Sequence, residues 1–467
     1  MQNRRDFILK LANFSAMAMI SPACVDRNKQ KGIIEGEEWR MGLDNGANDA
    51  GNYALNENML VQANDSIERI RKGNFIIRFI DENNQPLHGL KVILKQQNHD
   101  FDWGFSMAGT ICGMSASQQN RTKFVKELFN CTTAKCYWDE GWHQPIEKNE
   151  GERITDTFLG EVQWGRANEL RVKGHPLVWT VRKAVPAWMN KYSYAQQLKK
   201  LEEHVRELIR LGGESVTQWD LCNEMLWEPS LRNLPNRKWP HIETIDEILR
   251  YLEPAVQWAR DENPFVTYAL NDYGLVKTYA PGVTSAEQRQ RYVSLIHEMR
   301  RRGCAPDAIG SQCHVAGWYT FQEFNTMLDE LSEAGLPIQI TEFWAKLKDL
   351  PFKNMQEEKE QQKALIDYIS MIYTLAFAHP GVSHITYWGS KEWFDADGNP
   401  TQVYWVLHDL IKNKWMTNES LTTNADGEVA LRAFYGDYKM LVQDEKGNTR
   451  YIDLTLGRKA SDIVLQY

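Results

Sequence analysis

The chain has 467 residues, a formal net charge of -8, 42% hydrophobic residues and 25% charged residues. This balance is typical of a globular protein and excludes a disordered, collagenous or coiled-coil chain. A nucleic-acid partner is not expected, because neutralising phosphates needs clustered Lys and Arg. The 17 Trp residues leave two interpretations open: an aromatic-rich core, or platforms for flat apolar ligands such as sugar rings.

The first segment, residues 1–24, resembles an export signal of the lipoprotein type. Arg4 and Arg5 precede an apolar stretch, 7–20, that is too short to span a bilayer, and small residues then lead to Cys24. We therefore expect an exported protein that is periplasmic, anchored in the outer membrane or secreted. A lipid on Cys24 would be its membrane attachment. The other six cysteines are scattered without a CxxC pair, which argues against a zinc site.

Residues 25–63 form a polar lead-in, and residues 64–100 form a β segment. The β segment has a short helical stretch, 66–71, and two strand-like runs, 75–80 and 90–95. After a long central region, residues 433–467 again contain strand-like runs, at 434–442, 448–454 and 462–465. We expect these C-terminal strands to pair with the two early strands in a small accessory β unit.

The central region, 101–432, alternates strand and helix patterns and predicts an α/β fold of the (β/α)8 TIM-barrel type. A doubly wound open sheet is the structural alternative. Helical patterns cover 195–211, 286–302, 321–334 and 357–378. The eight predicted strands are 101–105, 129–133, 174–179, 216–221, 265–270, 308–312, 337–341 and 383–388.

Two carboxylates, Glu224 and Glu342, come directly after apolar strands of this predicted barrel. Functional groups of a parallel barrel gather at the C-terminal ends of its strands, and a carboxylate there is costly to bury without a partner. Two opposed carboxylates are the equipment of a glycoside hydrolase, with one as proton donor and the other as nucleophile. Either residue taken alone would more readily be interpreted as half of a structural salt bridge.

Six motifs resemble those of glycoside hydrolase family 10, the xylanase family, and they occur in the family's order between about residues 100 and 435. The acid/base motif resembles Trp-Asp-Val-Val-Asn-Glu, and the nucleophile motif matches Ile-Thr-Glu. The motifs read Gly174-His-Pro-Leu-Val-Trp179, Trp219-Asp-Leu-Cys-Asn223-Glu224, Asn271-Asp-Tyr273, Ile309-Gly-Ser-Gln-Cys-His314, Ile340-Thr-Glu342 and Ile385-Thr-Tyr-Trp-Gly389.

The resemblance implies a role for each matching residue. Glu224 would be the general acid/base, and Glu342 would be the nucleophile that forms a covalent glycosyl-enzyme. Asn223 would bind the 2-hydroxyl of the sugar, His314 would orient the nucleophile, and Gln312 would support the acid/base. The subsite for the reacting sugar would be lined by His175, Trp179 and Trp388, and Trp138, Tyr273 and Trp393 are further candidates. No metal or organic cofactor is implied.

The sequence departs from the family where a second sugar is gripped. The family stretch Asn-Glu-Met-Lys-Trp is replaced by Thr133-Ala-Lys-Cys-Tyr-Trp138, so its Glu, Asn and Lys are missing. The second His after the third-strand Trp is Thr180, and the nucleophile is followed by Phe343 and Trp344 where the family usually has Leu-Asp. We expect a retaining hydrolase of β-1,4-linked xylan or xylo-oligosaccharides. The alternatives are a β-glycosidase of the same fold acting on another glycan, and a carbohydrate-binding surface lipoprotein on an inactive scaffold.

Overall fold

A computed structural model describes residues 57–106, 115–140, 143–227, 231, 244–280, 282–314, 318–347, 357–459 and 461–467. All of these residues belong to one compact unit, 41–467. The predicted export segment with Cys24, and the lead-in before residue 57, lie outside the described residues. Within the described ranges, no helix has the length and apolarity needed to cross a membrane.

The central region is a closed barrel of eight parallel strands, as predicted, and not an open sheet. The barrel closes because β11 pairs with β3, for example Tyr387 with Phe105, and because β5 also pairs with β7. The two-residue β6, Val178–Trp179, continues the third predicted strand along the edge of β7. The barrel strands are β3 Asp102–Ser106, β4 Cys131–Lys135, β5 Arg171–His175, β7 Val216–Asn223, β8 Thr267–Asp272, β9 Ala308–Ser311, β10 Ile338–Phe343 and β11 Val382–Tyr387.

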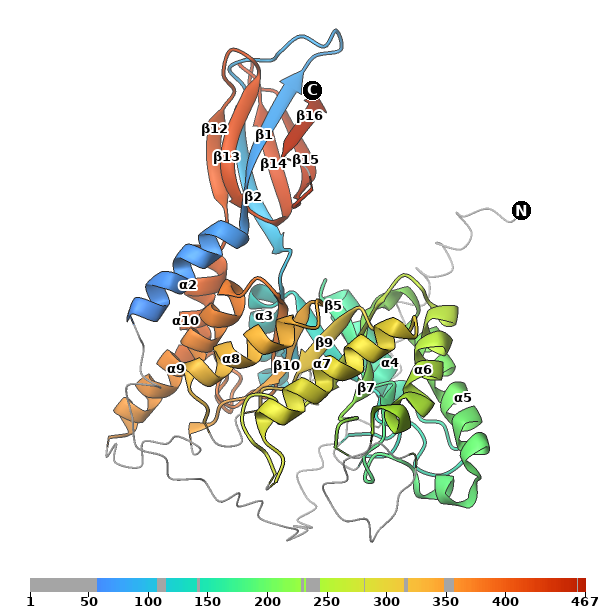
Figure 1. The fold of residues 1–467 in the computed structure, drawn as a ribbon. Coiled ribbons are helices and arrows are strands. Elements are labelled where there is room, and N and C mark those ends of the chain that lie inside the picture. The colour runs from blue at the N-terminus through green and yellow to red at the C-terminus, as the bar shows by residue number, and fades with distance from the viewer. Residues whose placement is uncertain are drawn as a thin grey trace, which may run out of the picture. The chain divides into compact units, whose positions relative to one another are not determined.

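Helices follow the barrel strands in chain order and cover them (Figure 1). Three of them, α6, α7 and α8, begin with the same Thr-x-x-Glu capping box, in which the Thr hydroxyl and the Glu carboxylate each satisfy a free backbone N–H group. The helices are α3 Ala116–Leu128, α4 Asp156–Ala167, α5 Tyr194–Gly212, α6 Ile245–Glu262, α7 Ser285–Arg301, α8 Phe321–Ser332, α9 Glu358–Ala378 and α10 Gln402–His408.

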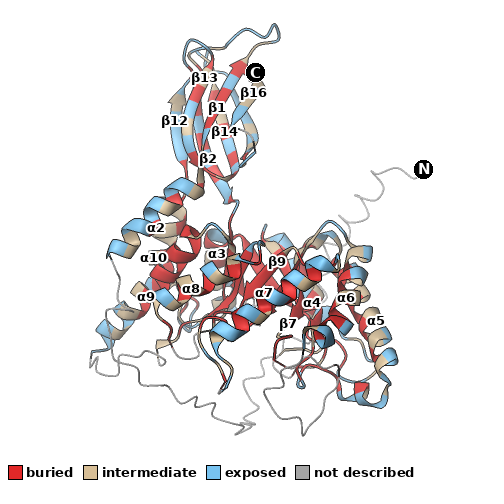
Figure 2. Ribbon diagram, viewed as in Figure 1, coloured by how far each residue is buried: buried red, intermediate tan, exposed pale blue. Residues whose placement is uncertain are grey.

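Each covering helix turns an apolar face toward the strands, which Figure 2 shows as buried residues on the inner side. In α5, Leu201, Val205 and Leu208 recur at helical spacing and are all buried. The helix ends at Gly213, whose φ of 50° lies in the left-handed region that favours glycine.

The accessory β unit is built from both ends of the chain, as predicted. One sheet has the order β13-β1-β16 and the other has the order β12-β2-β14-β15. Their inner faces share one apolar cluster, which includes Phe75, Val92 and Met440. The strands are β1 Lys72–Ile80, β2 Lys91–His99, β12 Asn418–Thr422, β13 Glu428–Phe434, β14 Gly436–Gln443, β15 Thr449–Leu456 and β16 Asp462–Gln466.

Two boundaries differ from the predicted ones. The accessory sheets include β12 and β13, so their C-terminal segment begins at Asn418 and not at residue 433. The early helix, α2, spans Glu57–Ile70 and so begins inside the predicted lead-in. The first part of this helix was not predicted because it is largely polar, and only Ala63 and Ile67 of the whole helix are buried.

The interior of the barrel carries a chain of polar side chains. Lys173 Nζ on β5 lies 2.7 Å from Asp220 Oδ1 on β7 and donates to Gln339 Oε1 on β10 at 2.7 Å. Gln339 donates to Gln218 at 3.0 Å, and Gln218 in turn donates to Asp102 at 2.5 Å. Barrel interiors are usually filled by branched apolar side chains. This interior differs because it contains a chain of hydrogen bonds and the buried ion pair of Lys173 with Asp220.

We predict that Lys173→Met lowers the free energy of unfolding by about 3–5 kcal/mol, because it leaves the buried Asp220 carboxylate without its cation. Urea unfolding of the variant measures this loss. Lys199→Met removes the same charge from an exposed position on α5 and should change stability by no more than about 0.5 kcal/mol. A loss below about 1 kcal/mol in Lys173→Met would show that the ion pair does not stabilise the barrel.

Candidate active site

The two predicted carboxylates both lie at the C-terminal rim of the barrel. Glu342 is the next-to-last residue of β10, and its N–H group donates to Gln312 O at 3.1 Å. Glu224 follows the last residue of β7, and its N–H group donates to Asn271 O at 2.8 Å. Glu224 has a φ of 59°, a left-handed conformation that costs free energy in a residue with a side chain. Such strain is typical of a functional position that neighbouring contacts hold in place.

Glu342 is buried and held as a carboxylate. Its Oε1 accepts a hydrogen bond from Asn271 Nδ2 at 2.9 Å, and its Oε2 lies 2.8 Å from His314 Nε2. His175 Nε2 is 3.9 Å from Oε1. Burial alone would raise the pKa of Glu342, but the hydrogen bond from His314 and the charges of His314 and His175 outweigh burial and lower it. Glu342 is therefore ionised near neutral pH.

The surroundings of Glu224 shift its pKa in the opposite direction. Burial is the main influence and raises the pKa of Glu224, and the negative charge of Glu342 raises it further. The positive charge of Lys183 and hydrogen bonds from Gln312 Nε2 at 2.9 Å and Trp179 Nε1 at 2.8 Å act against this rise without cancelling it. Glu224 thus retains its proton to higher pH than an ordinary Glu does.

Three amides connect the two carboxylates. Asn223 Oδ1 accepts from Asn271 Nδ2 at 3.0 Å and from Gln312 Nε2 at 3.3 Å. The same two amide groups bind Glu342 and Glu224 respectively. Both hydrogen bonds to Asn223 end on its oxygen, so neither of them uses its NH2 group. The network fixes the distance between the two acids through side chains from β7, β8 and the end of β9.

His175 is oriented from inside the barrel. Its Nδ1 lies 2.8 Å from Asp220 Oδ2, which directs Nε2 toward Glu342. The preceding residue must be a glycine, because a Cβ at Gly174 would lie 2.2 Å from the Trp219 ring. Packing against Trp219 therefore requires Gly174, and the hydrogen bond to Asp220 orients His175.

Aromatic side chains line the rim between the carboxylates. Trp388 packs edge-to-face on His175 with ring centroids 5.4 Å apart, and Trp179 lies 5.2 Å from Tyr137. Both Trp residues are partly exposed, as platforms for a ligand must be. The predicted residues His175, Trp179, Asn223, Gln312, His314 and Trp388 thus lie together with Glu224 and Glu342.

The three further candidates lie in different places. Trp393 is fully buried in the core against Phe129 and Tyr387, so it offers no face to a sugar and that prediction is wrong. Trp138 is buried, stacked on His204 with ring centroids 4.3 Å apart, and therefore packs in the protein interior.

Tyr273 is partly exposed and stacks on Trp227 at 4.9 Å. It also meets Tyr279 edge-on at 4.8 Å. Burial and the nearby charge of Glu224 both raise the pKa of Tyr279, which places this aromatic group on the Glu224 side of the site.

Several contributing residues were not predicted individually. Asn271 donates to both Asn223 and Glu342. It belongs to the Asn-Asp-Tyr motif, but no role was predicted for it. Asp220 lay inside the acid/base motif and orients His175. Lys183 and Tyr137 have no sequence signal, because only the folded rim brings them next to the two acids.

A potential metal-binding group exists at the opposite end of the barrel strands. Among the described residues, Asp102, Cys131 and His384 offer ligand atoms within 4.8 Å of one another. Asp102 already pairs with Arg171 at 2.5 Å, and burial raises the pKa of the Cys131 thiol. These side chains serve the packing of the barrel. The cysteines at 131, 136, 222, 304 and 313 are all free thiols and buried.

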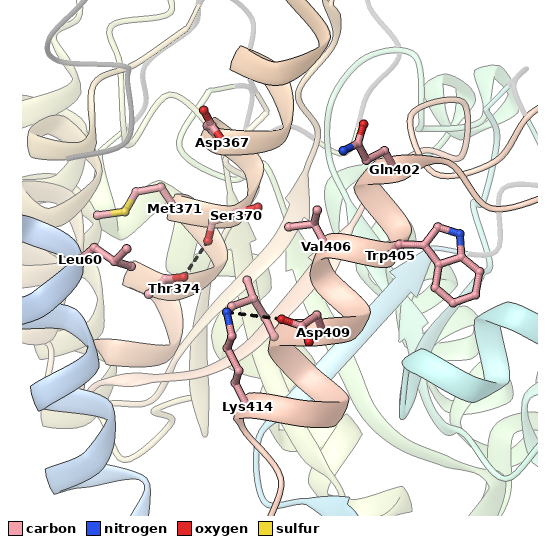
Figure 3. A pocket seen from close by; sticks show the side chains of 11 residues that line it. Leu60, Asp367, Ser370, Met371, Thr374, Gln402, Trp405, Val406, Asp409 and Lys414 are labelled. Atoms are coloured by element: carbon pink, nitrogen blue, oxygen red, sulfur yellow. Dashed lines mark hydrogen bonds and ion pairs between the residues drawn. The ribbon is translucent and has the colours of Figure 1, made fainter. Parts of the chain in front are cut away.

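A hollow of about 410 Å³ lies outside the barrel, between α9, α10 and the short π-helix Asp409–Lys414 (Figure 3). Its charged side chains are paired, Asp409 with Lys414 at 3.3 Å and Asp367 with Lys363 at 2.5 Å. The hollow contains neither site carboxylate, so we assign the chemistry to the barrel rim.

Known proteins resemble this chain in sequence and in fold. Endo-1,4-beta-xylanase B of Thermotoga neapolitana is 25% identical over 273 residues, which cover 54% of this chain and 73% of the relative. Anti-sigma-I factor RsgI6 of Acetivibrio thermocellus is 26% identical over 417 residues, which cover 87% of this chain and 49% of the relative. This chain therefore spans about half the length of that relative.

The fold has counterparts among solved structures. A GH10 structure from Paenibacillus barcinonensis superposes with a TM-score of 0.53 at 18% identity and covers 67% of this chain and 95% of that chain. At the level of sequence, the model of glycosyl hydrolase family 10 matches residues 96–402, which is more than half of the chain. The match includes every barrel strand and both rim carboxylates, and we conclude that the chain belongs to glycosyl hydrolase family 10.

Proposed function

We propose that the protein is a retaining glycoside hydrolase that cleaves β-1,4-linked xylan or xylo-oligosaccharides. The observation that carries the proposal is the pair of rim carboxyl groups with different partners, Glu342 beside Asn271 and His314 and Glu224 beside Gln312 and Trp179. In these surroundings the pKa of Glu342 is lowered and that of Glu224 is raised. Glycoside hydrolysis requires this division between a nucleophile and a proton donor.

In the first step, the Glu342 carboxylate attacks the anomeric carbon and forms a glycosyl ester. The bond from that carbon to the glycosidic oxygen breaks, and Glu224 gives its proton to the departing oxygen. Asn223 lies between the two acids, and its NH2 group would donate to the 2-hydroxyl of the reacting sugar. His314 and Asn271 hold the nucleophile in place.

In the second step, Glu224 is a carboxylate and acts as the general base. It takes a proton from water, the water oxygen attacks the anomeric carbon, and the ester bond to Glu342 breaks. Glu224 is protonated again and Glu342 is ionised again, so the site returns to its starting state. The two carboxylates supply both the proton and the nucleophile, and the scheme requires no cofactor.

The choice of xylan rests on relatives named as endo-1,4-beta-xylanases and on the motifs around the two acids. A relative that matches most of this chain is named as an anti-sigma-I factor, so membership in the family does not by itself establish turnover. A carbohydrate-binding protein on an inactive scaffold is therefore an outcome that the experiment must distinguish.

We also propose that the chain is exported and carries a lipid on Cys24. The support is the basic start at Arg4 and Arg5, the short apolar stretch after it, and the small residues that precede Cys24.

We predict that the purified protein releases reducing sugar from xylan, and that Glu342→Ala lowers the rate at least about 1,000-fold because the nucleophile is lost. The test compares xylan, arabinoxylan, mixed-linkage glucan, cellulose and aryl β-glycosides.

Glu333→Ala is the matched control. Glu333 is an exposed residue at the C-terminal end of α8, so this variant should retain full activity. Turnover of another glycan only would redefine the substrate. Binding of glycan without turnover of any would contradict the hydrolase and favour a binding protein.

We predict a bell-shaped pH dependence of kcat/KM. The acid limb reports Glu342, whose pKa is lowered, and the basic limb reports Glu224, whose pKa is raised. Lys183→Met removes a cation that favours the Glu224 carboxylate, so the basic limb should move to higher pH.

The acid limb is the internal control, because Lys183 is not among the groups that set the pKa of Glu342. A basic limb that stays in place or moves to lower pH would contradict the assignment of Glu224 as the proton donor.

A further inference from the structure

Lys135 brings a buried ammonium group to the rim of the barrel. It is the last residue of β4 and is only 8% exposed. Its Nζ lies 4.6 Å from the centroid of the Trp388 ring. The family resemblance assigns Trp388 to the subsite of the reacting sugar. The carboxylates of Glu342 and Glu161 are close enough for their charges to act on it.

The ammonium has no hydrogen-bond acceptor among the described residues. Glu161 uses its two oxygens to accept from the backbone N–H of Lys135 at 2.7 Å and to contact His143 Nε2 at 3.0 Å. Glu342 uses its two oxygens for Asn271 and His314. Lys135 Nζ is left with the face of Trp388, a contact worth less than the hydrogen bonds that an ammonium makes in water.

Such a group is unfavourable for folding. Burial lowers the pKa of Lys135, and the charges of Glu161 and Glu342 only partly offset this effect. A buried polar group without its hydrogen bonds costs free energy unless a ligand completes them. The position of Lys135 beside the nucleophile and the Trp388 platform indicates which ligand does so.

We propose that Lys135 is a substrate-binding residue whose ammonium donates hydrogen bonds to hydroxyl oxygens of the sugar held against Trp388. This inference rests on the proposed function. Glu161 and Glu342 already place two negative charges around one ammonium, so a neutral sugar is favoured over a sugar that carries a carboxylate. The contact also explains how this chain grips a sugar although the family's Glu, Asn and Lys are missing from the stretch 133–138.

Binding is measured by titration calorimetry with xylobiose in a Glu224→Gln background, which removes turnover. Adding Lys135→Met should raise the Kd about 10–100-fold, the effect of losing hydrogen bonds from a charged donor. Adding Lys148→Met, which removes the same charge from an exposed loop position, should leave the Kd unchanged. A change below about threefold in the Lys135→Met variant would overturn the proposal.

Monodeoxy xylobiose analogues identify the bonded hydroxyl. At least one analogue lacks the hydroxyl that the ammonium contacts, and it should bind equally well to the Glu224→Gln protein with and without the added Lys135→Met substitution. If the substitution weakens every analogue as much as it weakens xylobiose, the ammonium contacts no hydroxyl. If it weakens only a xylobiose that bears a uronic acid, the ammonium binds an anion. Either result contradicts the inference.

Thermal unfolding separates a binding role from a structural one. A ligand-binding ammonium without partners should not stabilise the free protein, so Lys135→Met should keep or raise the Tm. A fall of more than about 4 °C would indicate a structural role instead. Hydrolysis of xylan by the wild-type protein tests the proposed function separately, because the calorimetric and thermal results do not depend on turnover.

Discussion

The site depends on one electrostatic constraint, which is that two neighbouring carboxyl groups must hold different charges at the same pH. Glu342 accepts a hydrogen bond from Asn271 and faces two histidines, whereas burial and the negative charge of Glu342 raise the pKa of Glu224. The charge of Glu342 therefore helps to set the pKa of Glu224. The two acids are connected through three amides, because Asn271 binds Glu342, Gln312 binds Glu224, and both amides donate to Asn223.

Polar side chains in the barrel interior also act on Glu342, through His175. His175 approaches Glu342 because Asp220 holds its other nitrogen, and Asp220 is ionised because Lys173 and His175 outweigh the effect of burial on its pKa. Lys173 also donates to Gln339, which extends this chain of hydrogen bonds toward the opposite end of the strands. A substitution in the barrel interior is therefore expected to alter the environment of Glu342, although the substituted residue does not contact the substrate.

Two residues at the same rim have a strained backbone conformation. Glu224 and Cys313 both have positive φ values, 59° and 52°, although neither is a glycine. The turn after Glu224 is held by Asp272, whose carboxylate accepts from the N–H group of Leu226 at 2.9 Å. This contact helps to keep Glu224 in a backbone conformation that is unfavourable by itself.

Much of this arrangement could be predicted from sequence because the strands are short apolar runs and the motifs place polar residues directly after them. Glu224, Glu342 and His175 are examples, and strand order alone brings them to one rim. Trp393 was predicted wrongly because a Trp near the platform motif has the same sequence signal whether it faces a sugar or the core. Lys135 and Lys183 could not be assigned, since their role depends on which ring or carboxylate the fold brings near them. Strands β12 and β13 were missed because their exposed faces are polar and their partners lie more than 300 residues away.

The most direct test of the central claim is the anomeric configuration of the first product, observed by proton NMR during hydrolysis of a β-1,4-linked xylo-oligosaccharide. If Glu342 forms a covalent glycosyl-enzyme and Glu224 then activates water, the β-anomer of the new reducing end should appear first and convert slowly to the equilibrium mixture. Initial appearance of the α-anomer would mean that water attacks directly, and it would contradict the role assigned to Glu342.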